Sequence, residues 1–231
     1  SAFTAIMPPI PAISDFVYWT GLAAVAVNAV AGALESGRKG MDIVGISVVA
    51  LATALGGGTV RDVLLARPVF WIADPAYVFV AFASALLTFV LARAIPLSDR
   101  LFLLPDAFGL ALFAIAGTQI ALDGHAPWLV ASLMGVVTAT FGGVLRDVFC
   151  NEIPLIFLPG ELYASAALAG SLACIGLQAA GLDAVAAGWA GMVVVLALRL
   201  AGMTWKIRVP AFRARPSRGE ADGRRADPDT R

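Results

Sequence analysis

The chain has 231 residues, of which 60% are hydrophobic and 14% are charged, and its formal net charge is zero. A soluble domain carries about 25% charged residues, whereas only 20 of the 32 charged side chains here precede Lys206. Those charges are too few to coat a water-facing surface, so the composition excludes an ordinary soluble domain and predicts an integral membrane protein.

Seven apolar runs follow one another along the chain, and each has roughly the 20 residues that a helix needs to cross a bilayer. They cover residues 16–34, 43–66, 75–95, 102–122, 128–151, 161–181 and 184–204. Because a bilayer offers the backbone no hydrogen-bond partners, these segments must be helices. The expected fold class is an all-α membrane protein with seven transmembrane helices. An arm over residues 1–15 precedes them and a tail over 206–231 follows.

The basic residues of the short loops predict the orientation, because lysine and arginine favour cytoplasmic loops. If the tail, with its eight basic and four acidic residues, is cytoplasmic, then Arg38, Lys39, Arg93 and Arg100 lie on the same side. The N-terminal arm and the loops at residues 123–127 and 181–183 have no lysine or arginine. We therefore expect a bacterial inner-membrane protein with its N-terminus outside.

Two similar motifs stand 85 residues apart, ALGGGTVRDVLL at 54–65 and ATFGGVLRDVFC at 139–150. From Thr53 to Val63, seven of eleven positions are identical at this offset. The two units, residues 16–95 and 101–181, contain three spans each. An odd number of spans places the second copy in the opposite direction, so the sequence predicts an inverted repeat, and the span over 184–205 has no counterpart.

The glycines predict that the second and fifth spans are kinked or broken, since glycine weakens a helix by about 1 kcal/mol relative to alanine. Broken helices at matching places in inverted halves are typical of a transport pathway. Close helix packing is the alternative role for these glycines. The candidate pathway residues are Thr53, Gly56, Gly57, Gly58, Arg61, Asp62, Asp106, Thr138, Gly142, Gly143, Arg146 and Asp147.

The buried charges need partners, because an arginine at membrane depth costs at least about 2.5–3.5 kcal/mol. Adjacent residues on a helix point about 100° apart, so we expect Arg61 and Asp62 not to pair with each other. Each is expected to reach the other copy of the motif, Asp106, or backbone carbonyls. Asp106 itself either lines a cation vestibule or caps a helix. Arg199 is interpreted as a snorkelling side chain.

The stretch from GALESGRKG at residue 32 to VLL at 65, together with FGGVLRDVFCNEIPLIF at 141–157, closely resembles prokaryotic members of the trimeric intracellular cation channel (TRIC) family. The resemblance covers about residues 16–203. It implies seven helices in two inverted bundles plus one, a homotrimer with a pore in each protomer, and passive conduction of potassium and sodium. It also implies that the glycine motifs kink the pore-lining helices.

Three functional interpretations remain open from the residues. The first is a cation channel, in which the aspartates favour cations and the arginines act as fixed charges or a plug. The second is a secondary transporter of a small zwitterion such as glycine, a label that bacterial relatives also carry. The third is a structural or lipid-interacting membrane protein whose glycines serve packing, and the basic tail is compatible with contact to anionic lipids in all three interpretations. None requires a cofactor, a metal or a nucleic acid, and no pattern of nucleophile, base or metal ligands indicates an enzyme.

Overall fold

The structure is a computed structural model that describes residues 14–92, 101–158 and 162–205. Within these ranges it contains helices and no strand, which confirms the all-α class. The elements are α1 (Asp15–Arg38), α2 (Ile43–Leu64), α3 (Phe70–Ala73), α4 (Ala76–Ala92), α5 (Leu103–Asp123), α6 (Trp128–Phe149), the 3₁₀ helix η1 (Leu155–Phe157), α7 (Tyr163–Ala179) and α8 (Ala184–Trp205). The N-terminal arm up to residue 13, Arg93, Arg100 and the basic tail lie outside the described residues.

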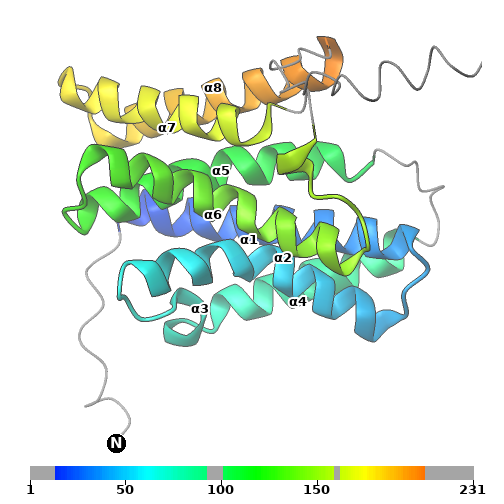
Figure 1. The fold of residues 1–231 in the computed structure, drawn as a ribbon. Coiled ribbons are helices and arrows are strands. Elements are labelled where there is room, and N and C mark those ends of the chain that lie inside the picture. The colour runs from blue at the N-terminus through cyan, green and yellow to red at the C-terminus, as the bar shows by residue number, and fades with distance from the viewer. Residues whose placement is uncertain (1–13, 93–100, 159–161, 206–231) are drawn as a thin grey trace, which may run out of the picture.

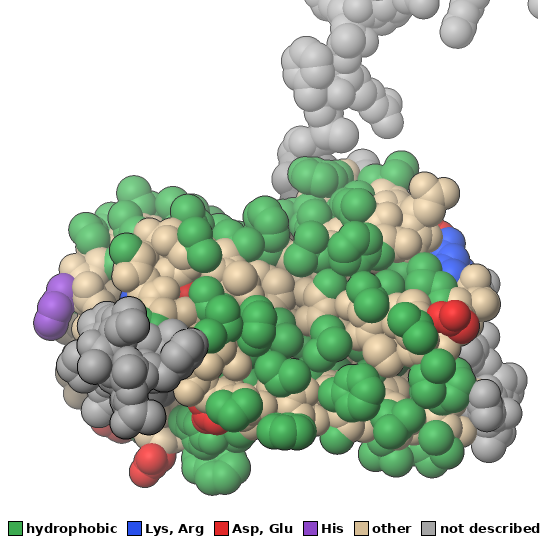
Figure 2. Space-filling view, turned by 90° about the horizontal axis from the view of Figure 1, so that it is seen from below, with side chains coloured by type: hydrophobic (Ala, Val, Ile, Leu, Met, Phe, Trp, Pro, Cys, Tyr) green, Lys and Arg blue, Asp and Glu red, His purple; other side chains and the backbone are tan. Residues whose placement is uncertain are grey.

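A helix occupies each of the seven ranges that the sequence predicts as spans. Among the described residues, five helices are long and apolar enough to cross a membrane: α1, α2, α5, α6 and α8. The other two, α4 and α7, are apolar but have 17 residues each. Figure 2 shows hydrophobic side chains over the middle of one face, with acidic and basic side chains towards its two ends. A bilayer stabilises this distribution, since its apolar core lies between two polar interfaces.

The helices lie roughly parallel in layers (Figure 1), with α7 and α8 at one edge and α3 and α4 at the other. The central helix is α5, which packs against α1, α6, α7 and α8 and is buried along most of its length. The helix α2 packs against α1, α4 and α6. This arrangement places α2 and α6 against each other, and those are the two helices that carry the glycine motifs.

The predicted interruption of α2 and α6 is wrong, because both are regular α-helices through their glycines. The glycines instead allow a close antiparallel contact. A Cβ atom on Gly57 would overlap the backbone oxygen of Thr138, and a Cβ on Gly142 would overlap that of Thr53. Backbone atoms cannot move aside as a side chain does, so only glycine permits this separation. The packing alternative therefore accounts for Gly57 and Gly142, and a bend that preserves the helical hydrogen bonds stays a prediction.

The remaining glycines of the motifs also meet neighbouring side chains. A Cβ on Gly56 would overlap the Leu145 side chain, one on Gly58 would lie 2.5 Å from the Phe70 ring, and one on Gly143 would lie 2.5 Å from the Tyr163 hydroxyl. All three glycines thus make room for another element rather than loosen their own helix.

Helix ends repeat at the same offset as the sequence motifs. Gly40 and His125 follow α1 and α5 with left-handed φ angles of 73° and 59°, and Ala66 and Asn151 follow α2 and α6 with φ angles of 51° and 56°. The N–H after Ala66 donates to the Asp62 carbonyl, and the N–H after Asn151 donates to the Asp147 carbonyl, both at 2.8 Å. This is the hydrogen bond of a Schellman motif, in which a left-handed residue ends a helix.

Replacing Ala66 with glycine is expected to raise the free energy of unfolding by roughly 0.5–1 kcal/mol, because relief of the left-handed strain exceeds the added flexibility of the unfolded chain. Chemical unfolding in detergent micelles measures the change. Asn151→Gly is the matched control and should gain less, since asparagine tolerates this conformation. A loss of stability in Ala66→Gly would contradict the strain.

Candidate ion pathway

The two arginine–aspartate motifs lie at opposite ends of the antiparallel α2–α6 pair and have the same local geometry. Arg61 Nε donates to Asp62 Oδ1 at 2.9 Å, and Arg146 Nε donates to Asp147 Oδ1 at 2.8 Å. The expectation that neighbours on a helix do not pair is therefore wrong. The arginine side chain is long enough to reach the carboxylate of the next residue, and each pair lies in the last turn of its helix.

The second oxygen of each aspartate holds the segment that follows. Asp62 Oδ2 accepts the Phe70 N–H at 2.9 Å, and Asp147 Oδ2 accepts the Leu155 N–H at 2.9 Å. Both acceptors precede their donors by eight residues, so each aspartate fixes the start of a short helix, α3 or η1. Each motif thus joins an ion pair to a backbone anchor.

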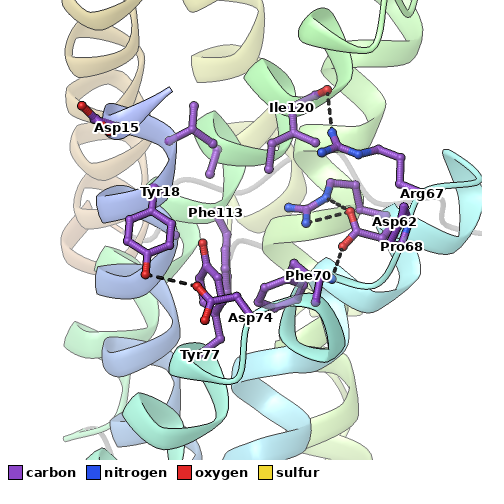
Figure 3. A pocket seen from close by; sticks show the side chains of 15 residues that line it. Asp15, Tyr18, Asp62, Arg67, Pro68, Phe70, Asp74, Tyr77, Phe113 and Ile120 are labelled. Carbon is purple, nitrogen blue, oxygen red and sulfur yellow. Dashed lines mark hydrogen bonds and ion pairs between the residues drawn. The ribbon is translucent and has the colours of Figure 1, made fainter. Parts of the chain in front are cut away.

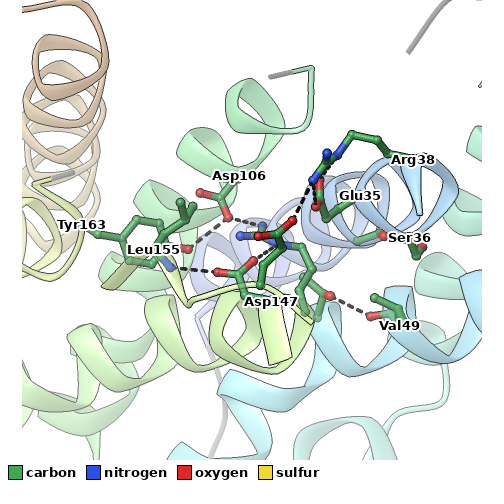
Figure 4. Close-up of polar contacts among 12 residues, drawn as sticks. Glu35, Ser36, Arg38, Val49, Asp106, Asp147, Leu155 and Tyr163 are labelled. Atoms are coloured by element: carbon green, nitrogen blue, oxygen red, sulfur yellow. Dashed lines mark hydrogen bonds and ion pairs between the residues drawn. The ribbon is translucent and has the colours of Figure 1, made fainter. Parts of the chain in front are cut away.

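The second motif continues into a buried group of charges that we call the Asp106 cluster (Figure 4). Its members are Asp106, Arg146, Asp147, Tyr163 and Arg199. Asp106 Oδ1 accepts from Arg146 Nη1 at 2.5 Å and from the Tyr163 hydroxyl at 3.0 Å. Arg199 approaches the other oxygen of Asp106 to 3.9 Å and lies 4.9 Å from the centre of the Tyr163 ring. The two arginines are fully buried, so this end of the α2–α6 pair is sealed.

Two expectations about these residues need correction. Asp106 neither lines an open vestibule nor caps α5, because its contacts join α6, α7 and α8 instead. Arg199 does not snorkel to the membrane surface: it is fully buried and turns towards Asp106. The Arg199 side chain gains more from the nearby buried carboxylate than it would gain from reaching water at the interface. Without Arg199, part of the charge in this environment would be left unneutralised, which costs several kcal/mol.

Charged residues of two loops meet at the same end of the bundle. Lys39, which follows α1, bonds to Glu152, which follows α6, and Arg38 contacts the same carboxylate at 3.5 Å. The hydrogen bond and the charge of Lys39 lower the pKa of Glu152. The contact ties the first unit to the second without reaching the buried Asp106 cluster.

The first motif differs from the second because it borders a pocket of about 410 Å³ (Figure 3). The pocket lies at the end of the bundle where α1 begins. In Figure 3, Asp62 and Arg67 lie on one side of it, and Tyr18 and Asp74 lie on the other. Its lining includes Asp15, Tyr18, Gly21, Arg61, Asp62, Arg67, Phe70, Asp74, Tyr77, Phe113, Ala116 and Ile120.

Polar contacts organise the walls of this pocket. The Tyr18 hydroxyl donates to Asp74 Oδ2 at 3.1 Å, and Arg67 Nη1 donates to the Ile120 carbonyl at 3.3 Å. Burial lowers the pKa of Arg67, since a half-buried guanidinium is poorly hydrated. An arginine remains protonated in proteins, so the pocket presents cationic and anionic groups together.

Of the twelve residues predicted for the pathway, only Arg61 and Asp62 line this pocket. Thr53, Gly57, Thr138 and Gly142 meet at the α2–α6 crossing, where both threonine hydroxyls donate back to their own helices. The other charged members belong to the Asp106 cluster. This pocket therefore borders the first motif, whereas the residues of the crossing and of the second motif are buried.

Sequence reasoning missed the wall formed by Asp15, Tyr18, Asp74 and Tyr77. Asp74 is the one charged residue of the connector IADP between two spans, and the two tyrosines are near span ends, so each gave only a weak indication of a site. Their convergence on one space was not visible, because α1 and α4 are separated by α2 in the chain.

These features define a class: a multi-pass α-helical membrane protein with an internal polar pocket next to buried ion pairs. A family model described as "Glycine transporter" matches residues 18–93 and 103–179, two ranges that begin 85 residues apart. The UPF0126 inner membrane protein YadS of Escherichia coli K12 is 40% identical over 200 residues, which cover 85% of this chain and 96% of that protein. A UPF0126 membrane protein of Vibrio cholerae is 39% identical and is covered to 84%.

Solved structures show the same family relationship. The TRIC trimeric intracellular cation channel orthologue from Rhodobacter sphaeroides superposes with a TM-score of 0.79 at 41% identity, over 83% of this chain and 98% of that one. A second TRIC cation channel gives a TM-score of 0.75 at 30% identity, over 89% of this chain and all of that one. The chain therefore belongs to the UPF0126 family of bacterial membrane proteins, to which the TRIC channels are related, and the predicted resemblance is confirmed.

Proposed function

We propose that the protein is a cation channel that conducts potassium and sodium passively through a pore within each protomer of a homotrimer. Its similarity to TRIC channels at 41% and 30% identity supports this function. The observation that carries the proposal is the pocket, whose wall holds the carboxylates of Asp15, Asp62 and Asp74 and ends at a buried ion pair. Carboxylates at the entrance of a narrow path favour cations over anions.

In the proposed topology the five long helices and the shorter α4 and α7 all cross the bilayer, and the two units run in opposite directions. The N-terminus lies outside and the C-terminus in the cytoplasm, so the pocket faces outwards. The identical Arg–Asp geometry at opposite ends of α2 and α6 supports the inverted relation. The basic tail contacts anionic lipids in this arrangement.

In this conformation the proposed pore is shut at two places. The first barrier is the α2–α6 crossing, where Gly57 and Gly142 bring two backbones into contact. The second is the Asp106 cluster, whose two arginines repel a cation that arrives without a compensating change. Conduction requires the two helices to separate and Arg146 to leave the path, which releases Asp106 to face the ion.

A zwitterion transporter is the second candidate function. One observation favours it: the pocket carries both signs of charge, with Arg61 and Arg67 in its lining and Asp74 on the side opposite Arg67. A zwitterion presents a carboxylate and an ammonium group, and this lining offers a charged partner for each.

Planar-bilayer recording of the purified protein in a potassium chloride gradient separates the two candidates. A channel gives single-channel currents with a reversal potential near that of potassium, and amino acids do not compete. A transporter gives saturable liposome uptake that a small amino acid inhibits. Silent bilayers with saturable uptake would reject the channel proposal.

Arg61→Ala is expected to raise the single-channel potassium conductance, because it removes a positive charge from the pocket wall and leaves Asp62 as a net negative charge held by the Phe70 N–H. Gly176→Ala is the control, since Gly176 lies on α7 and a Cβ added there would have no atom within 4 Å. A conductance equal to that of the unmodified protein would remove Arg61 from the pore.

A further inference from the structure

The two halves of the molecule differ at one matching position beside the arginines. At the offset of 85 residues that aligns Arg61 with Arg146, Asp106 corresponds to Gly21. Asp106 lies in α5 and Gly21 in α1, and these are the first long helices of their units. The second half therefore has a carboxylate beside its arginine where the first half has a hydrogen atom.

The surrounding groups are nevertheless alike. Tyr163, at the start of α7, donates its hydroxyl to Asp106 at 3.0 Å. Tyr77, at the start of α4, places its hydroxyl oxygen 3.2 Å from the position that a Cβ of Gly21 would occupy. A tyrosine hydroxyl thus approaches the matching position in both halves, and in the first half Gly21, Tyr77 and Arg61 line the same pocket. Only the second half supplies a carboxylate at that position.

In the first half, the counterparts of the two groups that donate to Asp106 Oδ1 have no such acceptor, although Arg146 Nη2 and Asp106 Oδ2 of the second half also lack a hydrogen bond. Among the described residues, the Arg61 guanidinium bonds only to Asp62, and its Nη1 has no hydrogen-bond partner. Within the same ranges no hydrogen bond of the Tyr77 hydroxyl is found, and the contacts of this side chain are those of its ring with Tyr18 and Phe70. Arg61 is 3% exposed and Tyr77 is 5% exposed, and both line the pocket. Buried polar groups are normally hydrogen-bonded, so donors that face a cavity indicate a ligand or solvent that completes them.

The two halves also differ in the number of carboxylates that pair with their arginines. In the Asp106 cluster two arginines, Arg146 and Arg199, meet two carboxylates, Asp106 and Asp147. At the first motif Arg61 pairs with the carboxylate of Asp62, whereas Arg146 pairs with both Asp106 and Asp147. Arg61 therefore has one carboxylate partner fewer than its counterpart.

We propose that the pocket binds a small molecule through a carboxylate group that takes the place of the Asp106 side chain. The carboxylate accepts from Arg61 Nη1 and from the Tyr77 hydroxyl, as Asp106 accepts from Arg146 Nη1 and Tyr163. A volume of about 410 Å³ leaves room for further atoms of the ligand between Tyr18, Phe70 and Phe113. This volume lies within the range of small-molecule sites. The inference goes beyond conduction, because binding is measured without a current.

The carboxylate can belong to a simple carboxylic acid or to an amino acid. An amino acid would direct its ammonium group towards Asp74, on the wall opposite Arg67. Propionate, β-alanine and propylammonium distinguish these sources, since the first has the carboxylate alone, the second has both groups and the third has the ammonium alone.

Isothermal titration of the full chain in detergent with these three probes tests the proposal. Propionate and β-alanine are expected to bind, β-alanine more tightly if the acidic wall contributes, and propylammonium is expected not to bind. Absence of binding by both carboxylates, or equal binding of propylammonium and propionate, would overturn the proposal.

Gly21→Asp supplies the carboxylate from the chain itself. It is expected to raise the melting temperature of the free protein and to abolish propionate binding. Gly21→Asn fills the same space without the charge and is expected to raise the melting temperature less. Propionate that still binds Gly21→Asp with unchanged affinity, or equal melting temperatures for the two variants, would contradict a carboxylate site.

Tyr77→Phe provides a test that does not depend on the folding of a Gly21 variant. It removes one hydroxyl from the pocket wall and keeps the ring contacts with Tyr18 and Phe70. A hydrogen bond to a charged group contributes about a tenfold change in affinity or more. The dissociation constant of propionate is therefore expected to rise about tenfold, and an unchanged constant would exclude Tyr77 as a donor.

Discussion

Asp106→Ala is expected to lower the free energy of unfolding by roughly 3–5 kcal/mol, because it leaves Arg146 and Arg199 buried without the carboxylate that they share. Both guanidinium groups are fully buried, and Asp106 is 1% exposed. The Tyr163 hydroxyl loses its acceptor in the same variant. Equilibrium unfolding in detergent micelles measures the loss.

The control lies on the same helix. Asp123, at the other end of α5, is exposed, and Asp123→Ala should change stability by no more than about 0.5 kcal/mol. A double variant in which Arg146→Met accompanies Asp106→Ala should be more stable than the sum of the two single changes predicts, because neither charge is then left without the other. A loss below about 1 kcal/mol for Asp106→Ala would show that water reaches the cluster.

Gly57→Ala and Gly142→Ala are each expected to cost about 1–3 kcal/mol, the usual penalty for overpacking. The added methyl group would overlap a backbone oxygen of the facing helix, either of Thr138 or of Thr53. Relief requires α2 and α6 to move apart along their whole contact, so the effect falls at the upper end of that range.

Gly176→Ala is the matched control, since a methyl group added at this position of α7 would have no atom within 4 Å. The same substitution there should stabilise the helix by up to about 1 kcal/mol. If Gly57→Ala and Gly142→Ala were also stabilising, the glycines would serve flexibility rather than close packing, and the expectation of loosened helices would hold after all.

The sequence by itself determined the class of the protein and the positions of its helices. A bilayer demands about 20 apolar residues for each crossing helix, and that demand acts on consecutive residues, so it can be read along the chain. The offset of 85 residues was visible in the motifs around Arg61 and Arg146, and the helix ends at Ala66 and Asn151 match at the same offset.

Only the tertiary structure decided what the motif residues contact. Glycine allows either a loosened helix or a close approach, and the presence of Thr138 against Gly57 selects the second. Arg199 has an apolar route to the interface in the sequence, but in space it lies beside Asp106, 93 positions earlier in the chain. Likewise, identical Arg–Asp pairs became different sites because α1 offers Gly21 where α5 offers Asp106. Periodicity and composition are local properties of the chain, whereas an ion pair or a cavity depends on helices that are distant in sequence, and packing alone brings those together.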